Sequence, residues 1–201
     1  LLSSTPRQIR VYQAMGVKTD EFPIFAHLPF VMGQDNAKLS KRNGEVSIAW
    51  YRESGFLPEA ICNYLALLGW SPGDDREDVS MSELVELFVL ERVNSSPARF
   101  DMKKLEAING EKIRKLTLDD FLSRALPFLL KDGVVSGKDE ELTVLRQALP
   151  IIQERIARMN EVSAMLKFLF TDELSFDQEA SAALSNEQAQ AVIAKSLEVL
   201  Q

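Results

Sequence analysis

The chain has 201 residues, of which 46% are hydrophobic and 26% are charged, and its net charge at neutral pH is −7. These values predict an ordinary globular protein with one large or two small domains. With one cysteine and one histidine, the chain cannot build an internal disulfide or a Cys/His zinc site. No apolar run approaches the roughly 18 residues that span a bilayer, so we expect a cytoplasmic protein without membrane contact or structural metal.

The beginning of the chain predicts one helix and one strand. Thr5 as N-cap and Pro6 at the first helical position are typical of a helix start, and Gly16 can end that helix in a left-handed conformation. The apolar run at residues 22–32, which contains two prolines, predicts a short buried strand and its exit. His27 lies in this run, and we interpret it as a hydrogen-bonded structural residue, not a catalytic one.

A basic loop follows the predicted strand, with the sequence Lys38-Leu39-Ser40-Lys41-Arg42. Two ammonium groups, a hydroxyl and a guanidinium are donors suited to phosphate oxygens. Phosphoryl and nucleotidyl transfer need positive charge where negative charge develops on the phosphates. On its own the string indicates an ordinary basic surface loop rather than a phosphate site, because so short a motif is a weak signal.

Beyond the basic loop the pattern changes to helices. Helix starts are predicted at Pro58, at Ser80 with Glu83 as a capping box, at Asp101 and at Thr117. The third of these helices is expected to end at Asn109-Gly110. Positions expected to face inward are Ile61, Leu65, Leu68, Leu84, Val85, Phe88, Leu105, Ile108, Phe121, Leu122 and Ala125.

The last part of the chain predicts two further helices after a loop at residues 132–139. Apolar residues between Leu142 and Met159 alternate steps of three and four, which is typical of a helix packed in a bundle. Ser185 and Gln188 predict the cap of a final helix. The side chains expected to be buried in this final helix are Val192, Ile193, Leu197 and Leu200.

Between Arg99 and Lys115 the chain carries six basic residues against three acidic ones. A local basic stripe on an acidic protein fits either a contact with RNA or a solvated helix face. Ahead of it, residues 95–101 present two hydroxyls, a proline and an arginine before the helix capped by Asp101. Such donors suit a phosphate backbone.

Several of these segments together resemble the bacterial glutamyl-tRNA synthetase family of class I aminoacyl-tRNA synthetases. The motifs occur in the family's order as far as Arg114, and beyond it the resemblance rests on the helical pattern. The matching segments are FAHLP at 25–29, the basic loop, GFLPEA at 55–60, NYLALLGWSPGD at 63–74, SSPARFD at 95–101 and NGEKIR at 109–114.

The resemblance implies a mainly α-helical chain with three parts. Residues 1–48 would be the C-terminal remnant of a Rossmann-type α/β catalytic domain, residues 49–116 a helical stem-contact domain, and residues 117–201 an incomplete helical anticodon-binding bundle. One histidine cannot supply the His-x-Gly-His element with which class I synthetases hold ATP. We therefore expect an inactive fragment of a glutamate–tRNA ligase, which activates glutamate with ATP and transfers it to the 3′ end of tRNA.

The resemblance also implies roles for individual residues. Lys41 would pair with the ATP phosphates during activation, with Lys38 and Ser40 in support and Arg42 beside them. The backbone at Phe30 and Val31 would lie against the adenine, although both also fit as core strand residues. Contacts with the tRNA stems would come from Ser95, Ser96, Arg99, Lys104, Lys112 and Arg114.

The partners that the resemblance implies are tRNA, ATP with Mg²⁺, and L-glutamate, whose pocket would lie mostly outside this chain; the family suggests a monomer. Two alternatives remain. The chain could be a non-catalytic tRNA-binding helical module, or part of the related glutaminyl enzyme. The glutaminyl enzyme reads its anticodon with β-barrels, and the helical periodicity after Thr117 argues against it. The same stretch counts against short tRNA-modifying paralogues, which lack the helical anticodon part.

Overall fold

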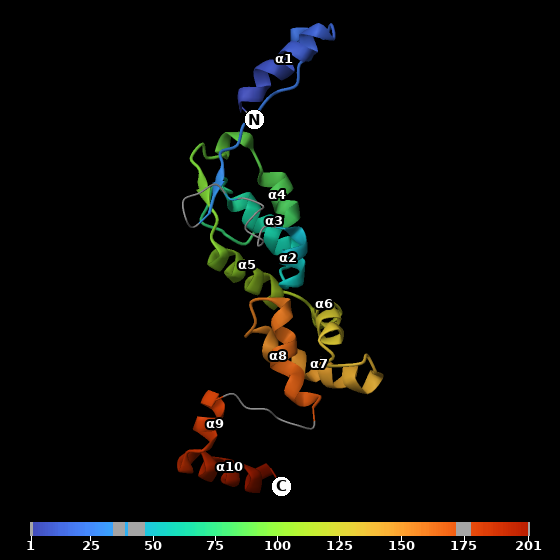
Figure 1. The fold of residues 1–201 in the computed structure, drawn as a ribbon, viewed down its shortest axis with the longest axis vertical. Coiled ribbons are helices and arrows are strands. Elements are labelled where there is room, and N and C mark those ends of the chain that lie inside the picture. Colours follow the sequence, from blue (N-terminus) through green and yellow to red (C-terminus); the bar gives the residue numbers. More distant parts are fainter. Residues whose placement is uncertain (1, 34–38, 40–46, 172–177, 201) are drawn as a thin grey trace.

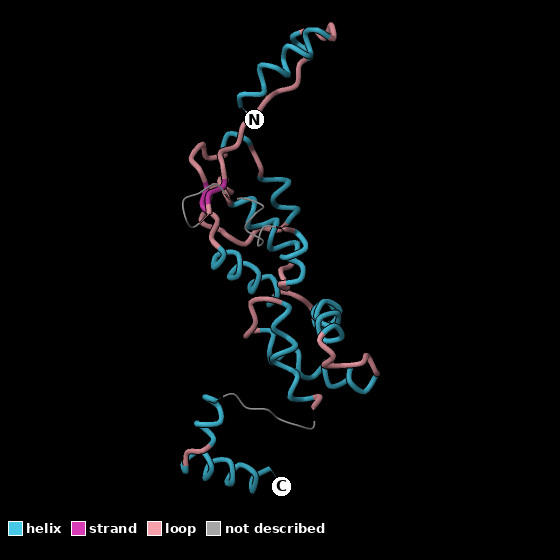
Figure 2. Tube along the Cα trace, viewed as in Figure 1, coloured by secondary structure: helices cyan, strands magenta, loops and turns pink. Residues whose placement is uncertain are grey.

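The structure is a computed structural model that describes residues 2–33, 39, 47–171 and 178–200, and helices dominate it (Figures 1 and 2). The prediction of a mainly helical chain is confirmed. The α-helices are α1 (Thr5–Ala14), α2 (Ile48–Glu53), α3 (Pro58–Leu67), α4 (Met81–Leu87), α5 (Met102–Arg114), α6 (Leu118–Lys131), α7 (Asp139–Gln153), α8 (Val162–Leu166), α9 (Gln178–Leu184) and α10 (Glu187–Leu200). Short 3-10 helices lie at Leu2–Ser4, Thr19–Glu21, Leu90–Arg92, Met159–Glu161 and Lys167–Leu169.

Two short strands form the sheet of the described residues, β1 (Val31–Met32) and β2 (Ala98–Arg99). They pair in parallel, with Val31 opposite Ala98 and Met32 opposite Arg99. The N–H of Phe100 also donates to the carbonyl of Met32 at 2.8 Å. The pairing joins two segments that are far apart in the sequence, and Figure 2 shows them side by side.

The prediction of a buried strand over residues 22–32 is wrong for most of that run. Only its last two residues are a strand, and Ile24 is 96% exposed. Pro23 and Pro29 lack the N–H that a central strand donates to its neighbour. His27 is exposed in this extended stretch, and its Nε2 lies 3.0 Å from Oγ1 of Thr5, so it is hydrogen-bonded as predicted.

Helix α1 begins at Thr5, one residue earlier than predicted, so that Ser4 occupies the N-cap position without a side-chain cap bond. Gly16 follows the helix with φ +77°, the predicted left-handed conformation. Helix α1 and helix α10 lie at opposite ends of an elongated molecule (Figure 1).

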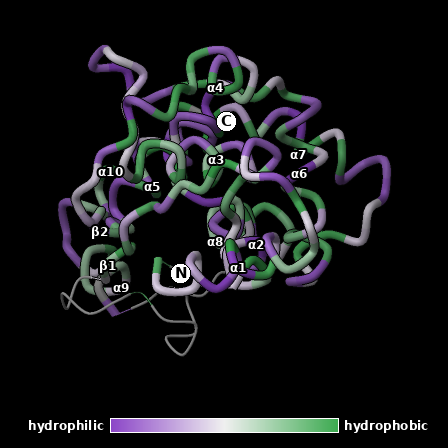
Figure 3. Tube along the Cα trace, turned by 90° about the horizontal axis from the view of Figure 1, so that it is seen from above, coloured by the Kyte–Doolittle hydropathy of each residue, from purple (hydrophilic) through white to green (hydrophobic). Residues whose placement is uncertain are grey.

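One hydrophobic core runs from α2 and α3 through α5 to α6, α7 and α8. Its fully buried large side chains include Leu105, Ile113, Phe121, Leu129, Leu145 and Leu149. A second, smaller cluster is made of Trp70, Val79 and Leu84. Seen along the long axis, polar and apolar positions alternate along the helices, as expected for amphipathic helices (Figure 3).

The predicted helix starts are confirmed where a local cap defines them. Pro58 is the first residue of α3. Ser80 and Glu83 form the capping box of α4. The side chains of Asp101 and Thr117 accept backbone N–H groups at the starts of α5 and α6. These signals are read within a single turn, so the sequence alone is enough to recognise them.

The predicted inward positions are only partly right. Leu105, Ile108, Phe121, Leu122 and Ala125 are buried as predicted. On α3 the buried residues are instead Ala60, Asn63 and Tyr64, and on α4 only Leu84 is buried; Leu65, Val85 and Phe88 are exposed. Helix α3 packs against α5 with the face that contains Ala60 and Tyr64. The position of α5, and not hydrophobicity alone, therefore determines which face of α3 is buried.

Two predicted helix ends differ from the structure. Helix α5 continues past Asn109 and Gly110, both buried, to Arg114. Helix α7 ends at Gln153. The buried Ile156 lies in the segment that follows it, and the buried Met159 begins a 3-10 helix. The predicted loop at residues 132–139 lies between α6 and α7, where Gly133 and Gly137 have positive φ.

The burial predicted for the last helix is wrong for its described side chains. Val192, Ile193 and Leu197 are exposed, because α10 contacts α9 and lies away from the other helices (Figure 1). Leu200 lies outside the described side chains. The N–H of Gln188 bonds to the side-chain oxygen of Asn186 at 3.0 Å, so Asn186 takes the role predicted for Ser185.

Candidate nucleic-acid interface

The basic loop is anchored at the end of β1. The N–H of Leu39, the second residue of the basic string, donates at 2.9 Å to the carbonyl of Val31, the first residue of β1. Lys38, Ser40, Lys41 and Arg42 lie outside the described residues. The anchor therefore fixes where the loop returns, while the roles of its charged residues rest on their chemistry and on the resemblance.

Phe30 and Val31 stand in different surroundings. Phe30, which directly precedes β1, is 59% exposed, and this exposure does not fit a core strand residue. Val31 lines an apolar cavity of about 220 Å³, together with residues of α3 and the segment that follows α4. Trp70 lines the same cavity, and its buried Nε1 has no hydrogen-bond partner among the described residues.

The segment at residues 94–101 is held at both ends. The N–H of Asn94 donates to the carbonyl of Gly69 at 2.6 Å, and the N–H of Asp101 donates to the hydroxyl of Tyr64 at 2.6 Å. Between these anchors Ser95, Ser96 and Arg99 are exposed, and Arg99 belongs to β2. The arrangement presents two hydroxyls and a guanidinium at the surface from a fixed backbone.

The basic residues of α5 face acidic partners that precede α4. Lys104 Nζ lies 2.6 Å from Glu77, and both Lys112 and Lys115 contact Asp78. The ammonium group of Lys112 also donates to the carbonyl of Val79 at 3.1 Å, and its side chain is 13% exposed. Lys112 therefore holds α5 against the segment before α4, whereas Lys104 remains accessible at the surface.

Arg114 and Lys103 complete the stripe on α5. Arg114 pairs with Glu111 one turn earlier at 2.8 Å, and Lys103 is exposed in the first turn. Glu77 and Asp78 are partners of the stripe that the sequence pattern did not predict. Their signal was an acidic stretch, residues 74–78, whose charge is opposite to that of α5.

Asp78 and Glu59 are among the carboxyl groups whose pKa values lie below their ordinary range. Burial raises the pKa of Asp78, but hydrogen bonds from Lys112 and Lys115 outweigh this effect and hold the pKa low. The guanidinium of Arg124 hydrogen-bonds Glu59 at 2.8 and 3.1 Å and lowers the pKa of that carboxyl. Both carboxyl groups are therefore ionised at neutral pH.

These shifts predict a stability that depends on pH. A carboxyl whose pKa is lower in the folded than in the unfolded chain contributes its full stabilisation above roughly pH 4, the unfolded pKa, and loses it as the pH falls through the folded pKa. We expect Asp78→Asn to lower Tm at pH 7 by about 2–4 °C, corresponding to about 1 kcal/mol, and to reduce the further loss on acidification. Thermal unfolding between pH 7 and pH 3 tests this.

The matched control for this experiment is Asp132→Asn, at an exposed position after α6. It removes one carboxylate without removing an ion pair that the structure shows. If Asp78→Asn and Asp132→Asn gave the same dependence of Tm on pH as the unsubstituted chain, the pairing of Asp78 with Lys112 and Lys115 would not contribute to stability.

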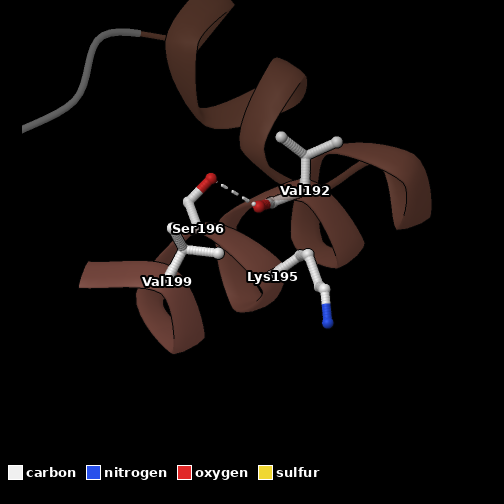
Figure 4. A pocket seen from close by; sticks show the side chains of 4 residues that line it. All are labelled: Val192, Lys195, Ser196 and Val199. Carbon is white, nitrogen blue, oxygen red and sulfur yellow. Dashed lines mark hydrogen bonds between the residues drawn. The ribbon is translucent and has the colours of Figure 1, made fainter. Parts of the chain in front are cut away.

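Other hollows of the described chain offer less chemistry. One is lined by α10 alone, where Ser196 donates to the carbonyl of Val192 at 2.8 Å and Lys195 points away (Figure 4). Another is an apolar groove of about 280 Å³ between α7 and the α8 region. Among the described residues, no group of three or more His, Cys, Asp or Glu side chains could hold a metal ion. No helix in the same residues is long and apolar enough to cross a membrane.

Comparison with known families gives two matches that together cover most of the chain. Residues 1–107 match the family described as tRNA synthetases class I (E and Q), catalytic domain. Residues 120–201 match the family described as anticodon binding domain. The first match covers the basic loop, residues 94–101 and the start of α5, and the second covers α7 to α10.

Curated relatives match the chain over its whole length. The chain is 45% identical over 207 residues to a glutamate–tRNA ligase of Saccharopolyspora erythraea, covering 100% of this chain and 41% of the relative. It is 47% identical over 208 residues to a glutamate–tRNA ligase of Nocardioides sp., covering 100% of this chain and 42% of the relative. The chain therefore spans less than half the length of these relatives.

A solved structure shares the fold. The glutamate–tRNA ligase of Elizabethkingia meningosepticum, crystallised in complex with its amino acid, superposes with a TM-score of 0.75 at 29% identity. The match covers 96% of this chain and 41% of that one.

Proposed function

The chain belongs to the class I tRNA synthetases (E and Q), and from this membership we propose that it is part of a glutamate–tRNA ligase, which activates glutamate with ATP and transfers it to the 3′ end of tRNA. The observation that carries the proposal is that a match to the catalytic domain and a match to an anticodon-binding domain follow each other in one chain. The helices α6 to α8 favour the glutamyl over the glutaminyl enzyme, because the latter reads its anticodon with β-barrels.

For the chain we propose the three parts described above: residues 1–48 as the end of the catalytic domain, 49–116 as the stem-contact domain and 117–201 as part of the anticodon-binding domain. The first boundary would lie at α2, where the main core begins, and the second at the connection between α5 and α6. The stem-contact part would then fall mostly within the match to the catalytic domain, which runs to residue 107. We further propose that the protein acts in the cytoplasm as a monomer.

ATP would be held by the basic loop and the end of β1. The ammonium groups of Lys38 and Lys41, the hydroxyl of Ser40 and the guanidinium of Arg42 are donors that fit phosphate oxygens. The backbone at Phe30 and Val31 would lie against the adenine, where the ring of Phe30 is exposed. The carboxylate of glutamate would attack the α-phosphate of ATP, which forms glutamyl-adenylate and releases pyrophosphate. Mg²⁺ would enter with the nucleotide.

The tRNA stems would lie along residues 95–101 and the exposed side of α5. Ser95, Ser96 and Arg99 present donors from an anchored backbone, and Lys104 and Arg114 take part in ion pairs that are partly exposed to water. Exposed pairs contribute little to stability, so these two side chains can exchange their carboxylate partners for phosphates. Lys112 would act indirectly, by holding α5 in place through Asp78 and Val79.

The test is an assay of amino-acid attachment by the protein that carries this chain at the length of its relatives. With ATP and tRNA, we expect labelled glutamate to become attached and labelled glutamine not to. The 201-residue chain alone should attach neither, while it still binds tRNA. Attachment of glutamine would favour the glutaminyl enzyme. No attachment of either amino acid, with tRNA binding retained, would favour a non-catalytic tRNA-binding module.

A further inference from the structure

The turn between α2 and α3 touches the segment that follows α7 through their backbones. The carbonyl of Gly55 accepts the N–H of Met159 at 2.9 Å. Gly55 has φ +82°, and a Cβ atom placed on it would lie 2.6 Å from the backbone nitrogen of Met159 and closer still to that of Asn160. Only glycine fits this approach, because a side chain would have to push one backbone away from the other.

Asn109 of α5 binds both of these segments at once. Its side-chain oxygen accepts the N–H of Leu57 at 2.8 Å, and its side-chain nitrogen donates to the carbonyl of Ala157 at 2.6 Å. The nitrogen also lies 3.4 Å from the carbonyl of Gly55. Asn109 is 0% exposed. An unpaired buried polar group costs about 1–3 kcal/mol, so these bonds favour a single arrangement of the three segments.

Two further links join helices α2–α5 to helices α6–α8. Gln153, the last residue of α7, donates to the carbonyls of Ile113 and Leu116 at 2.8 and 3.0 Å, which lie at the end of α5. Arg124 of α6 pairs with Glu59 of α3 through both carboxylate oxygens. The links come from α3, the end of α5, α6 and α7, so several elements besides Asn109 hold the two groups together.

We propose that Asn109 and Gly55 are positioning residues that form a rigid joint between helices α2–α5 and helices α6–α8. The proposal rests on the proposed function, in which the first group carries the stem-contact surface and the second belongs to the anticodon-binding part. A tRNA that contacts both groups binds best when their relative orientation is already correct, because no binding energy is then spent on ordering them. The joint would therefore set the geometry in which the tRNA reaches the catalytic end.

The direct test compares two glycine substitutions in the 201-residue chain. Gly55→Ala and Gly133→Ala both place alanine at a positive φ, +82° and +67°, so they introduce similar backbone strain. Only Gly55 has neighbouring atoms in the way; a Cβ at Gly133 would meet nothing within 4 Å. Spin labels at Glu86 of α4 and Lys131 of α6, in a Cys62→Ala background, report the distance between the two groups by pulsed electron paramagnetic resonance.

We expect one narrow distance distribution in the unsubstituted chain and in Gly133→Ala, and a broad or shifted one in Gly55→Ala. Asn109→Asp, which keeps the acceptor for Leu57 and removes the donor to Ala157, is the second variant should Gly55→Ala fail to fold. A distribution in the joint variants as narrow as that of Gly133→Ala, at the same mean distance, would overturn the joint. This measurement does not depend on any catalytic activity.

The positioning role is tested in the protein that carries this chain at the length of its relatives. Gly55→Ala and Asn109→Asp should each raise KM for tRNA about tenfold and leave KM for ATP unchanged. Gly133→Ala should change neither KM. A broadened distance distribution with an unchanged KM for tRNA would refute the positioning role. If the unsubstituted protein attached no glutamate, the proposed function would fail, and the distance measurement would still decide whether the joint is rigid.

Discussion

Replacement of Lys41 by alanine is expected to lower the rate of glutamate activation by about a hundredfold or more, as the loss of a charge contact made in the transition state does. The expectation rests on the position of Lys41 in the string Lys38-Leu39-Ser40-Lys41-Arg42 and on the hydrogen bond that anchors Leu39 to Val31 of β1. An ammonium group is a compact charge that can follow the phosphates as their negative charge increases. The measurement is ATP–pyrophosphate exchange in the protein of full family length, with tRNA present.

The matched control is Lys131→Ala, which removes an exposed lysine at the end of α6. It changes the net charge equally, and it should leave the exchange rate unaltered. Thermal unfolding curves of both variants should coincide with that of the unsubstituted protein, so that a loss of rate can be assigned to chemistry. A near-normal exchange rate in Lys41→Ala would show that Lys41 does not contact the reacting phosphates.

The structure separates features that local sequence predicts from those it cannot. The caps at Ser80, Asp101 and Thr117 were predictable, because the residues that form each cap are neighbours in the chain. Asn109-Gly110 resembles a helix stop for the same local reason. The side chain of Asn109 instead forms hydrogen bonds with the backbones of Leu57 and Ala157, which are 52 and 48 residues away in the sequence. Such distant partners override a local signal.

The candidate site shows the same division. The chemistry of the basic loop and the hydroxyls at Ser95 and Ser96 can be recognised from residue type and order. The partners of the basic stripe cannot, because Lys104 meets Glu77 across 27 residues. Exposure is equally hard to predict: Leu65 is apolar but exposed, and Asn63 is polar but buried, where it accepts the N–H of Val79 at 3.0 Å. Whether such a side chain is buried depends on the elements that pack against its helix, and the periodicity of one helix does not reveal those elements.

Simultaneous replacement of Arg99, Lys104 and Arg114 by alanine is expected to abolish the binding of tRNA by the 201-residue chain. These side chains belong to the anchored segment at residues 94–101 and to α5, and they supply most of the positive charge that the proposed stem surface presents. The net charge of −7 leaves little general attraction for RNA, so affinity must come from a few shaped contacts. Replacement of Lys38 and Lys41 should hardly change it, because the loop is assigned to ATP.

Titration of labelled tRNA at two salt concentrations measures this effect. The logarithm of the binding constant should fall with the logarithm of salt at a shallow slope, roughly one unit for each phosphate contact. The matched control replaces Arg7, Arg10 and Lys18 by alanine. These residues are exposed in and after α1, and their replacement also removes three positive charges. If this control weakened binding as much as the triple replacement on α5 and β2, binding would follow net charge alone. If the loop lysines mattered more, the tRNA surface would lie at the end of β1 and not along α5.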